Sequence, residues 1–284
     1  MPKRLLAALL IGIAGLSPAT AQTLTNAQRD AAITFALNNT RHTMLHEIGH
    51  LLVDQLNLPV LGREEDAVDM MATLNMLDTG TEADIIALQD TVDGWLNSEA
   101  VRPSRGYVHS DFYGVHSLDI QRSYSIACLM VGSDFERHTR FATRISLPID
   151  RQDSCAEDFR LANAGWASVL KPHRRAGAEL SEVTVEYRSS WPYAEAEGLI
   201  RGVMLLEHYA DWLAKSYDLP HPVHLSADVC DEVNAFYDPD AREVILCYEW
   251  VDYFYEMYVS DIMPKREHFA MMRKLKLEKI GRFE

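Results

Sequence analysis

Apolar positions recur at helical spacing through the first two-thirds of the chain. In these segments the apolar residues fall on one face of a helix with about 3.6 residues per turn, and polar residues lie between them. Pro59 and Gly62 end the first segment, and the Pro, Ser and Gly residues between Arg102 and Gly106 indicate a loop. We expect helices over about 25–57, 63–77, 82–96, 115–131 and 150–170.

The pattern changes after the loop-like segment from Pro172 to Gly177. Short runs of β-branched and aromatic residues predict strands there, and Asp-Pro-Asp-Ala at 238–241 is a turn sequence that joins the last two strands into a hairpin. The expected strands are 183–187, 223–225, 234–237 and 243–248, and the expected helices are 194–217 and 250–258. The fold class is therefore α+β, mainly helical with a small sheet.

We expect one domain after an N-terminal signal peptide. The three or four short strands would hardly be stable alone, and the length is near the upper limit for one hydrophobic core. The domain then spans 22–284, with a helical part at 22–172, a strand-containing part at 181–260 and a basic C-terminal tail at 264–284.

Residues 1–21 have the three parts of a secretory signal peptide. Two basic residues are followed by an apolar stretch from Leu5 to Leu16 and by Ala-Thr-Ala, which ends at Ala21. The apolar stretch is shorter than the ~20 residues that span a bilayer, although an uncleaved anchor is the alternative. We expect cleavage near Ala21, a secreted or periplasmic protein and no transmembrane segment in the mature chain.

The net charge of the chain argues against nucleic acids as partners. The chain of 284 residues has 48% hydrophobic residues, too many for a disordered protein, and a formal net charge of -15. Such a polyanion repels phosphate backbones, so nucleic-acid binding is not expected. The one basic stretch is the tail, which either makes weak contact with a membrane surface or, as we prefer, packs as a terminal helix on the acidic body. Its cations are Lys265, Arg266, Arg273, Lys274, Lys276, Lys279 and Arg282.

The four cysteines predict two disulfides if the protein is exported to an oxidising compartment. Their spacing favours Cys128 with Cys155 and Cys230 with Cys247, although four cysteines permit three pairings. Four buried free thiols are the alternative.

The first predicted helix contains His46-Glu47-Ile48-Gly49-His50, which is the pattern H-E-x-x-H. Residues four apart lie on one face of a helix, so both imidazoles can bind one zinc ion. Glu47 can reach a metal-bound water without being a ligand. A catalytic zinc normally has three protein ligands, so the site needs a third.

The next predicted helix supplies a candidate for the third ligand. Glu65 and Asp69 form E-x-x-x-D, one turn apart, after the turn that ends the first helix. We expect Glu65 to complete the metal site and Asp69 to accept the spare N–H of a ligand histidine. Glu64 and Asp66 compete for these roles but are expected to point to other faces of the helix.

His42 extends the histidine pair by one helical turn. It is either an alternative ligand or, as we prefer, polar lining or exposed. The alternative to the metal site as a whole is a surface helix with two solvated histidines, followed by an acidic helix N-terminus that the helix dipole stabilises.

Several stretches resemble a family of uncharacterised secreted bacterial zinc metallopeptidases, gluzincin-like, with HExxH followed by ExxxD. They are HEIGHLLVDQLNLPVLGREEDAVD, HSLDIQRSYSIACLMVGSD, CAEDF and CDEVNAFYDP. The resemblance covers most of the mature chain. The resemblance implies zinc binding and hydrolysis in a zinc-peptidase-like fold. It fixes no substrate.

Asn234-Ala235-Phe236 and the turn after it are similar to the N-A-F hairpin of CAAX-prenyl-type zinc proteases. In those enzymes an edge strand lies beside the HExxH helix and an extended substrate pairs with it, which implies substrate binding by 234–236. There the hairpin precedes the zinc helix, whereas here it follows. We therefore expect a permuted order, with the hairpin folded back over the first helix. The alternative is a structural hairpin held by a disulfide.

Hydrolysis also needs a group that stabilises the developing oxyanion, a role that zinc fills in part. His116 is the first candidate for this catalytic role, followed by Tyr113 and Tyr124. Arg122 either binds a substrate carboxylate or, as we prefer, pairs with an acid of the protein.

These residues predict a secreted hydrolase with one Zn²⁺, a metallopeptidase in which Glu47 activates the zinc-bound water and a peptide or protein is cleaved. Two alternatives stay open. One is a non-catalytic, disulfide-stabilised envelope binding protein, against which the intact Glu47 argues because a structural zinc has no use for that carboxylate. The other is a zinc amidase acting on a non-peptide or cell-wall amide.

Overall fold

The computed structural model describes residues 24–100 and 106–280, with side chains described as far as residue 271. The predicted signal peptide and its cleavage point lie outside the described residues. So do most residues of the predicted loop at 102–106 and the side chains of the later basic residues of the tail.

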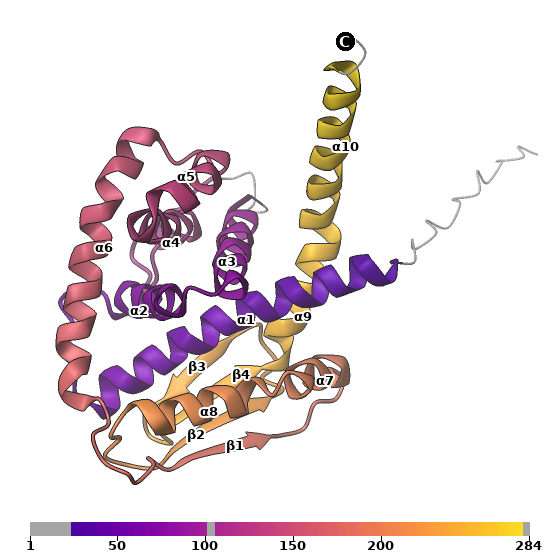
Figure 1. Cartoon of the computed structure of the whole chain (residues 1–284). Coiled ribbons are helices and arrows are strands. Elements are labelled where there is room, and N and C mark those ends of the chain that lie inside the picture. The colour runs from indigo at the N-terminus through magenta and orange to yellow at the C-terminus, as the bar shows by residue number, and fades with distance from the viewer. Residues whose placement is uncertain (1–23, 101–105, 281–284) are drawn as a thin grey trace, which may run out of the picture.

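Helix α1 (Asn26–Gln55) is the central element of the molecule. It begins at a capping box, in which the Thr25 side chain accepts a hydrogen bond from the Gln28 backbone and the Gln28 side chain accepts one from the Thr25 backbone. From Asn38 to Leu52 nearly every residue of α1 is buried, because other elements cover the helix on two sides. In Figure 1 the other early helices lie on one side of α1 and the sheet lies on the other.

The helical layer is built around α4, which contacts α2, α3, α5 and α6. Gly80 ends α2 in the left-handed conformation at φ 59°, which glycine adopts without strain. A disulfide between Cys128 and Cys155 joins α4 to α6. The helices are α2 (Glu64–Thr79), α3 (Glu82–Ala100), α4 (Asp119–Ser133), α5 (Phe135–Arg144) and α6 (Ile149–Leu170), followed by the 3-10 turn η2 (Lys171–His173).

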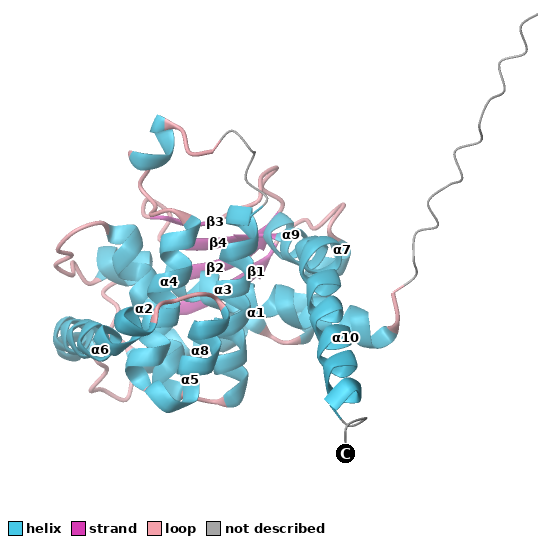
Figure 2. Ribbon diagram, turned by 90° about the horizontal axis from the view of Figure 1, so that it is seen from above, coloured by secondary structure: helices cyan, strands magenta, loops and turns pink. Residues whose placement is uncertain are grey.

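The sheet has the order β1-β2-β4-β3 in the described part of the chain, and Figure 2 shows the four strands side by side. β1 with β2 and β2 with β4 are parallel, whereas β3 and β4 form an antiparallel hairpin. A second disulfide, Cys230 to Cys247, ties the loop after β2 to the end of β4. Both disulfides have the pairing that the spacing favours. The strands are β1 (Val183–Tyr187), β2 (Val223–Asp228), β3 (Ala235–Asp238) and β4 (Glu243–Cys247).

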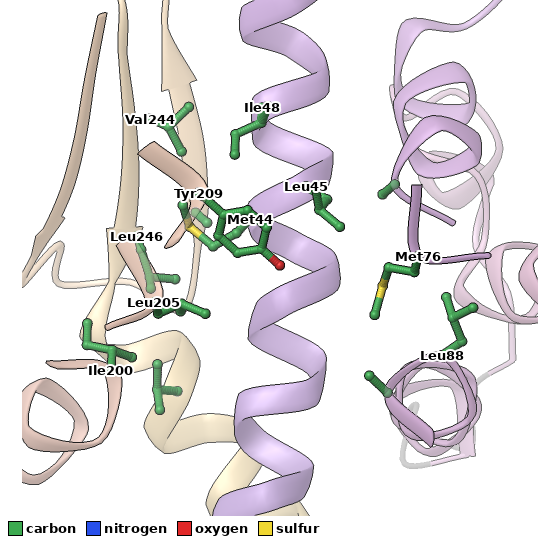
Figure 3. Packing of buried hydrophobic residues seen from close by; sticks show 14 of the residues in the cluster. Met44, Leu45, Ile48, Met76, Leu88, Ile200, Leu205, Tyr209, Val244 and Leu246 are labelled. Atoms are coloured by element: carbon green, nitrogen blue, oxygen red, sulfur yellow. The ribbon is translucent and has the colours of Figure 1, made fainter. Parts of the chain in front are cut away.

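One face of the sheet packs on α1 and on α8 (Leu205–Ser216). Tyr209 of α8 is buried, and its hydroxyl donates to the backbone oxygen of Arg41 in α1. Figure 3 shows α1 between the sheet, with Val244 and Leu246, and the helical layer, with Met76 and Leu88. The apolar core is therefore continuous on both sides of α1.

The last helices complete the core and lead to the C-terminus. α7 (Ala194–Gly202) and α9 (Tyr248–Met257) pack on each other, and the π-helical turn η3 (Tyr258–Ile262) leads into α10 (Met263–Ile280). Near the start of α10, Arg266 donates to Asp90 and Asp93 of α3, so this part of the basic tail packs on acidic residues of the body. Further along, α10 extends away from the body (Figure 1). Membrane contact by the tail stays a prediction.

The α+β class and the strands agree with the prediction, and the helix bounds differ in three places. The helix expected from 115 begins only at Asp119, so residues 106–118 form a loop with the 3-10 turn η1 (His109–Phe112). The helix expected over 194–217 is two helices, because Met204 adopts a left-handed φ of 50° between them. α5 has no predicted counterpart. None of the helices in the described residues is long and apolar enough to cross a membrane.

Candidate metal centre and active site

The H-E-x-x-H histidines lie in the second half of α1, facing the first turn of α2. The chain reverses between the two helices through Asn57 and Gly62, whose φ values are 47° and 128°. The helices approach closely at Gly49, where a Cβ would lie 2.7 Å from the Cβ of Val68. This close approach, which requires glycine, sets Glu65 opposite the two histidines.

Three ligand atoms form a nearly equilateral triangle. Glu65 Oε2 lies 3.2 Å from His46 Nε2 and 3.3 Å from His50 Nε2, and the two Nε2 atoms are 3.3 Å apart. Zinc bonds of about 2.0–2.1 Å in a tetrahedral arrangement place two ligand atoms about 3.3–3.4 Å apart. One zinc ion therefore fits all three atoms, and their chemistry, two imidazoles and one carboxylate, is that of a catalytic zinc site.

Asp69 fixes the orientation of His46. His46 Nδ1 lies 2.7 Å from Asp69 Oδ1, which leaves Nε2 directed at Glu65. Arg122 of α4 donates to both oxygens of Asp69, at 2.6 and 2.7 Å, and its guanidinium stacks 3.9 Å from the Trp95 ring centre. Burial by itself would raise the pKa of Asp69, but Arg122 and His46 hold it well below its usual range. Asp69 is therefore an ionised acceptor, as a ligand histidine requires.

Glu64 plays the corresponding part for His50, contrary to our expectation that it points elsewhere. Its Oε1 lies 2.7 Å from His50 Nδ1. Glu64 is the first residue of α2, so its long side chain can extend past the helix start toward α1. The sequence places Glu64 next to Glu65 but carries no signal for this contact, because it depends on the angle between two helices.

The acids around the histidines favour a bound cation. Burial would lower the pKa of His46, yet hydrogen bonds with Asp69 and Glu65 raise it to about 9. Burial likewise opposes a charge on Glu65, but hydrogen bonds from His116, His46 and His50 keep its pKa well below the usual range. A metal ion at this position would compete with protons for the same nitrogen lone pairs.

Glu47 is buried beside the triangle and takes no part in it. Its Oε1 lies 4.0 Å from His46 Nε2, and the side chain lines the same cleft as the two histidines. Burial raises the pKa of Glu47. A buried carboxylate with a raised pKa, this close to His46 Nε2 and not one of the three triangle atoms, is suited to accept and return a proton.

The other residues that the sequence suggested for the site lie in different surroundings. His116 lies in the site, with Nε2 at 2.9 Å from Glu65 Oε2. Tyr113 lines the cleft and is 73% exposed, whereas the Tyr124 hydroxyl donates to the backbone oxygen of Ile145 and serves the fold. His42, which we expected to line the site or to be exposed, does neither: it is buried, at 3.2 Å from the Thr73 hydroxyl, and does not line the cleft. Arg122 pairs with an acid of the protein, as we preferred.

The hairpin reaches the same site. A cleft of about 1280 Å³ is lined by His46, Glu47 and Glu65 on one side and by Asn234, Ala235 and Phe236 on another. Tyr237 of β3 donates its hydroxyl hydrogen to Asp54 of α1 at 2.6 Å. The hairpin and the histidine helix are therefore adjacent, although almost two hundred residues separate them in sequence.

One side of β3 is open. Within the described residues β3 pairs with β4 alone, at the edge of the sheet. Cys247 N–H donates to Asn234 O, and Asn234 lies opposite Cys247 in the register. Hydrogen bonding alternates along an antiparallel pair, so the backbone groups of Ala235 and Tyr237 point away from β4. The Ala235 N–H is held by the Asn234 side chain at 3.0 Å.

Comparison with known proteins identifies the family. A sequence model of the DUF4344 family, described as "Putative metallopeptidase", matches residues 14–170 and 188–275, which is most of the chain. The chain belongs to this family. No match was found among curated proteins or among solved structures. Membership in a metallopeptidase family implies a metal cofactor, and His46, His50 and Glu65 are a donor set that fits one.

Proposed function

We propose that this protein is an extracytoplasmic zinc-dependent peptidase, with His46, His50 and Glu65 as the metal ligands and Glu47 as the general base. The observation that carries the proposal is the triangle of ligand atoms, with sides of 3.2, 3.3 and 3.3 Å, next to a buried carboxylate that is not a ligand. A purely structural metal site has no need of that carboxylate.

A zinc ion held here would act as a Lewis acid beside the substrate carbonyl and would make a nearby water molecule more acidic. Glu47 would take the proton of the attacking water and give it to the leaving amine. Burial, which raises the pKa of Glu47, makes this carboxylate a stronger base than one in solvent. Asp69 and Glu64 would keep the two imidazoles in the tautomer that presents Nε2.

The open side of β3 supports a peptide as the substrate. An extended peptide in the cleft would pair, as an added strand, with the outward carbonyl of Ala235 and the outward backbone groups of Tyr237, because the Ala235 N–H is already held by Asn234. Asn234 and Phe236 would line its path. Pairing through the backbone favours a peptide or protein over a small amide, because each added residue contributes further hydrogen bonds.

Two features support a location outside the cytoplasm. The first residues have the pattern of a secretory signal, and both pairs of cysteines form disulfides. Disulfides of this kind persist in oxidising compartments such as the periplasm or the cell exterior.

The test is Glu47→Gln, which keeps the shape of the side chain and removes the base. We expect zinc content equal to that of the unaltered protein and hydrolysis of an internally quenched peptide library lowered about 10²- to 10⁴-fold, the usual contribution of a general base. Metal content is measured by elemental analysis, and Glu82→Gln, at an exposed glutamate at the start of α3, is the matched control. Undiminished cleavage by Glu47→Gln would exclude the role of Glu47. Cleavage of cell-wall amides with no cleavage of peptides would favour an amidase.

A further inference from the structure

His116 brings a third imidazole to the metal position. Its Nε2 lies 2.9 Å from Glu65 Oε2, and donor atoms of His46, Glu65 and His116 all lie within 4.8 Å of one another. The rings of His46 and His116 are nearly parallel, at 19°. The site therefore offers one more nitrogen ligand than the two histidines and one glutamate of the sequence motif.

The atom that His116 contacts indicates its role. A carboxylate has two oxygens, and a residue that only positions Glu65 would be expected to bind the oxygen facing away from the metal. His116 instead approaches Oε2, the same oxygen that lies 3.2 and 3.3 Å from the other two Nε2 atoms. Three imidazole nitrogens thus surround the Glu65 oxygen that faces the proposed metal position, which places His116 within reach of the same ion.

The loop that carries His116 is held less firmly than the other ligands. His46 and Glu65 lie on long helices, whereas His116 lies on the loop 106–118 and its side chain is 50% exposed. Its neighbours Tyr113 and Val115 are 73% and 67% exposed. Few buried contacts oppose movement of this loop, so a bond from His116 is the one that can be released.

We propose that His116 is a fourth protein ligand of the metal and that loop 106–118 keeps the site closed until this ligand leaves. This inference rests on the proposed function. Zinc sites with four protein ligands are closed, whereas catalytic sites keep one position open. In this protein the two states would differ by the position of a single exposed side chain, which would make the folded enzyme latent.

The test compares full-length unaltered protein, His116→Ala and His109→Ala, each loaded with Co²⁺ in place of zinc. His109 is an exposed histidine on the same loop and is the matched control. We expect His116→Ala to change the visible Co²⁺ spectrum and to weaken metal binding about tenfold or more in chelator competition. Added imidazole should restore the spectrum of the unaltered protein to His116→Ala, and His109→Ala should match the unaltered protein.

Peptide hydrolysis by the zinc forms gives a second readout. Removal of a closing ligand raises the activity of His116→Ala above that of the unaltered protein. Loss of an oxyanion-stabilising group would instead lower it about 10²- to 10³-fold. An unchanged spectrum and unchanged metal affinity in His116→Ala would overturn the fourth ligand and leave the proposed function intact. Failure of the unaltered protein to bind Co²⁺ or zinc would overturn both.

Discussion

At the scale of single residues, the site depends on acids that hold histidines in place. His46 and His50 each have a carboxylate on Nδ1, so each presents Nε2 to the same point. Asp69 is itself held by Arg122, which stacks on Trp95. The series of side-chain contacts from Trp95 to His46 thus links four helices, α3, α4, α2 and α1.

Asp69→Asn tests this series of contacts. The asparagine amide lacks the negative charge of Asp69 that fixes the His46 tautomer. We therefore expect the affinity for zinc to fall about 10- to 100-fold, the usual effect of altering a residue that holds a ligand histidine. Competition with a chromophoric chelator measures it. Asp66→Asn, the same change three residues earlier in α2, is the control and should bind zinc normally. Equal affinities in the two variants would contradict the role of Asp69.

The sequence contains enough to predict part of this site and not the rest. H-E-x-x-H and E-x-x-x-D are periodic patterns within single helices, so the proposed ligands His46, His50 and Glu65 can be selected without a structure. The partners Glu64 and Trp95 cannot, because their contacts cross between helices. Arg122 could be predicted to pair with an acid, but nothing in the sequence says that the acid is Asp69.

At the scale of elements, the distance between α1 and α2 controls where Glu65 lies relative to the two histidines. Gly49 lies where α1 meets Val68 of α2, with no room for a side chain. Any group there must push α2 outward, and Glu65 lies only three residues before Val68. The glycine within H-E-x-x-H is therefore required by helix packing.

Gly49→Ala is expected to weaken zinc binding at least tenfold, because the added methyl group forces α2 and Glu65 away from the histidines, and overpacking of this kind costs about 1–3 kcal/mol. Chelator competition and thermal unfolding measure the two effects. Gly165→Ala in α6 is the control, since nothing lies within 4 Å of its Cβ position. There the substitution should stabilise the helix slightly. Normal zinc affinity in Gly49→Ala would disprove the packing requirement.

The open side of β3 gives a second prediction at this scale. Tyr237→Pro removes an outward N–H, whereas Tyr237→Ala removes the same side chain and keeps the N–H. If substrate pairs with this edge, kcat/KM for a long peptide should be about tenfold lower in the Pro variant than in the Ala variant, which corresponds to about one hydrogen bond. Equal kcat/KM values, with both variants folded by circular dichroism, would rule out strand addition at Tyr237.

The bounds of the helices and strands show where the spacing of apolar residues in the sequence predicts the structure well. The strands and α1 were predicted closely, because their apolar patterns are regular and because Pro59 follows the end of α1 and Pro239 the end of β3. The apolar pattern over 194–217 continues through the break at Met204, since the left-handed φ of one residue leaves the spacing of apolar positions almost unchanged. Residues 115–118 have helical spacing but serve the loop that carries His116.

At the scale of the whole molecule, the class α+β and the disulfide pairing followed from local sequence, whereas the arrangement of layers did not. Adjacent cysteines in the chain pair with each other, so spacing was informative. The position of α1 between the helical layer and the sheet arises from contacts between segments more than a hundred residues apart, such as Tyr209 with Arg41. Such contacts have no periodic signal.

Global stability should depend on pH through His42, which is buried in α1. Burial lowers its pKa from 6.5 to about 4 in the folded protein. Between pH 4 and pH 6.5 His42 is protonated in the unfolded chain but neutral in the folded protein. Its contribution to the free energy of unfolding is therefore complete above pH 6.5 and is lost as the pH falls toward 4. The loss is at most about 3 kcal/mol.

Urea unfolding at pH 7 and pH 4.5 measures this effect. The free energy of unfolding should fall less between the two pH values in His42→Gln than in the unaltered protein, because the variant lacks the titration of His42. The carboxylates and the other histidines are the same in both proteins, so they contribute equally to both drops. His221→Gln, near the exposed start of β2, is the control and should leave the drop unchanged. An equal drop in His42→Gln would show that this histidine is not held neutral.

The central position of α1 couples unfolding of the sheet to loss of the proposed metal ion. Met44 and Ile48 face the sheet while His46 and His50 face the cleft, so the same two turns of helix serve both. Detachment of the sheet would expose these turns to solvent and let them fray. Occupancy of the ion would therefore report on the integrity of the sheet as well, and proteolytic removal of the strands should release the ion even though no strand supplies one of its proposed ligands.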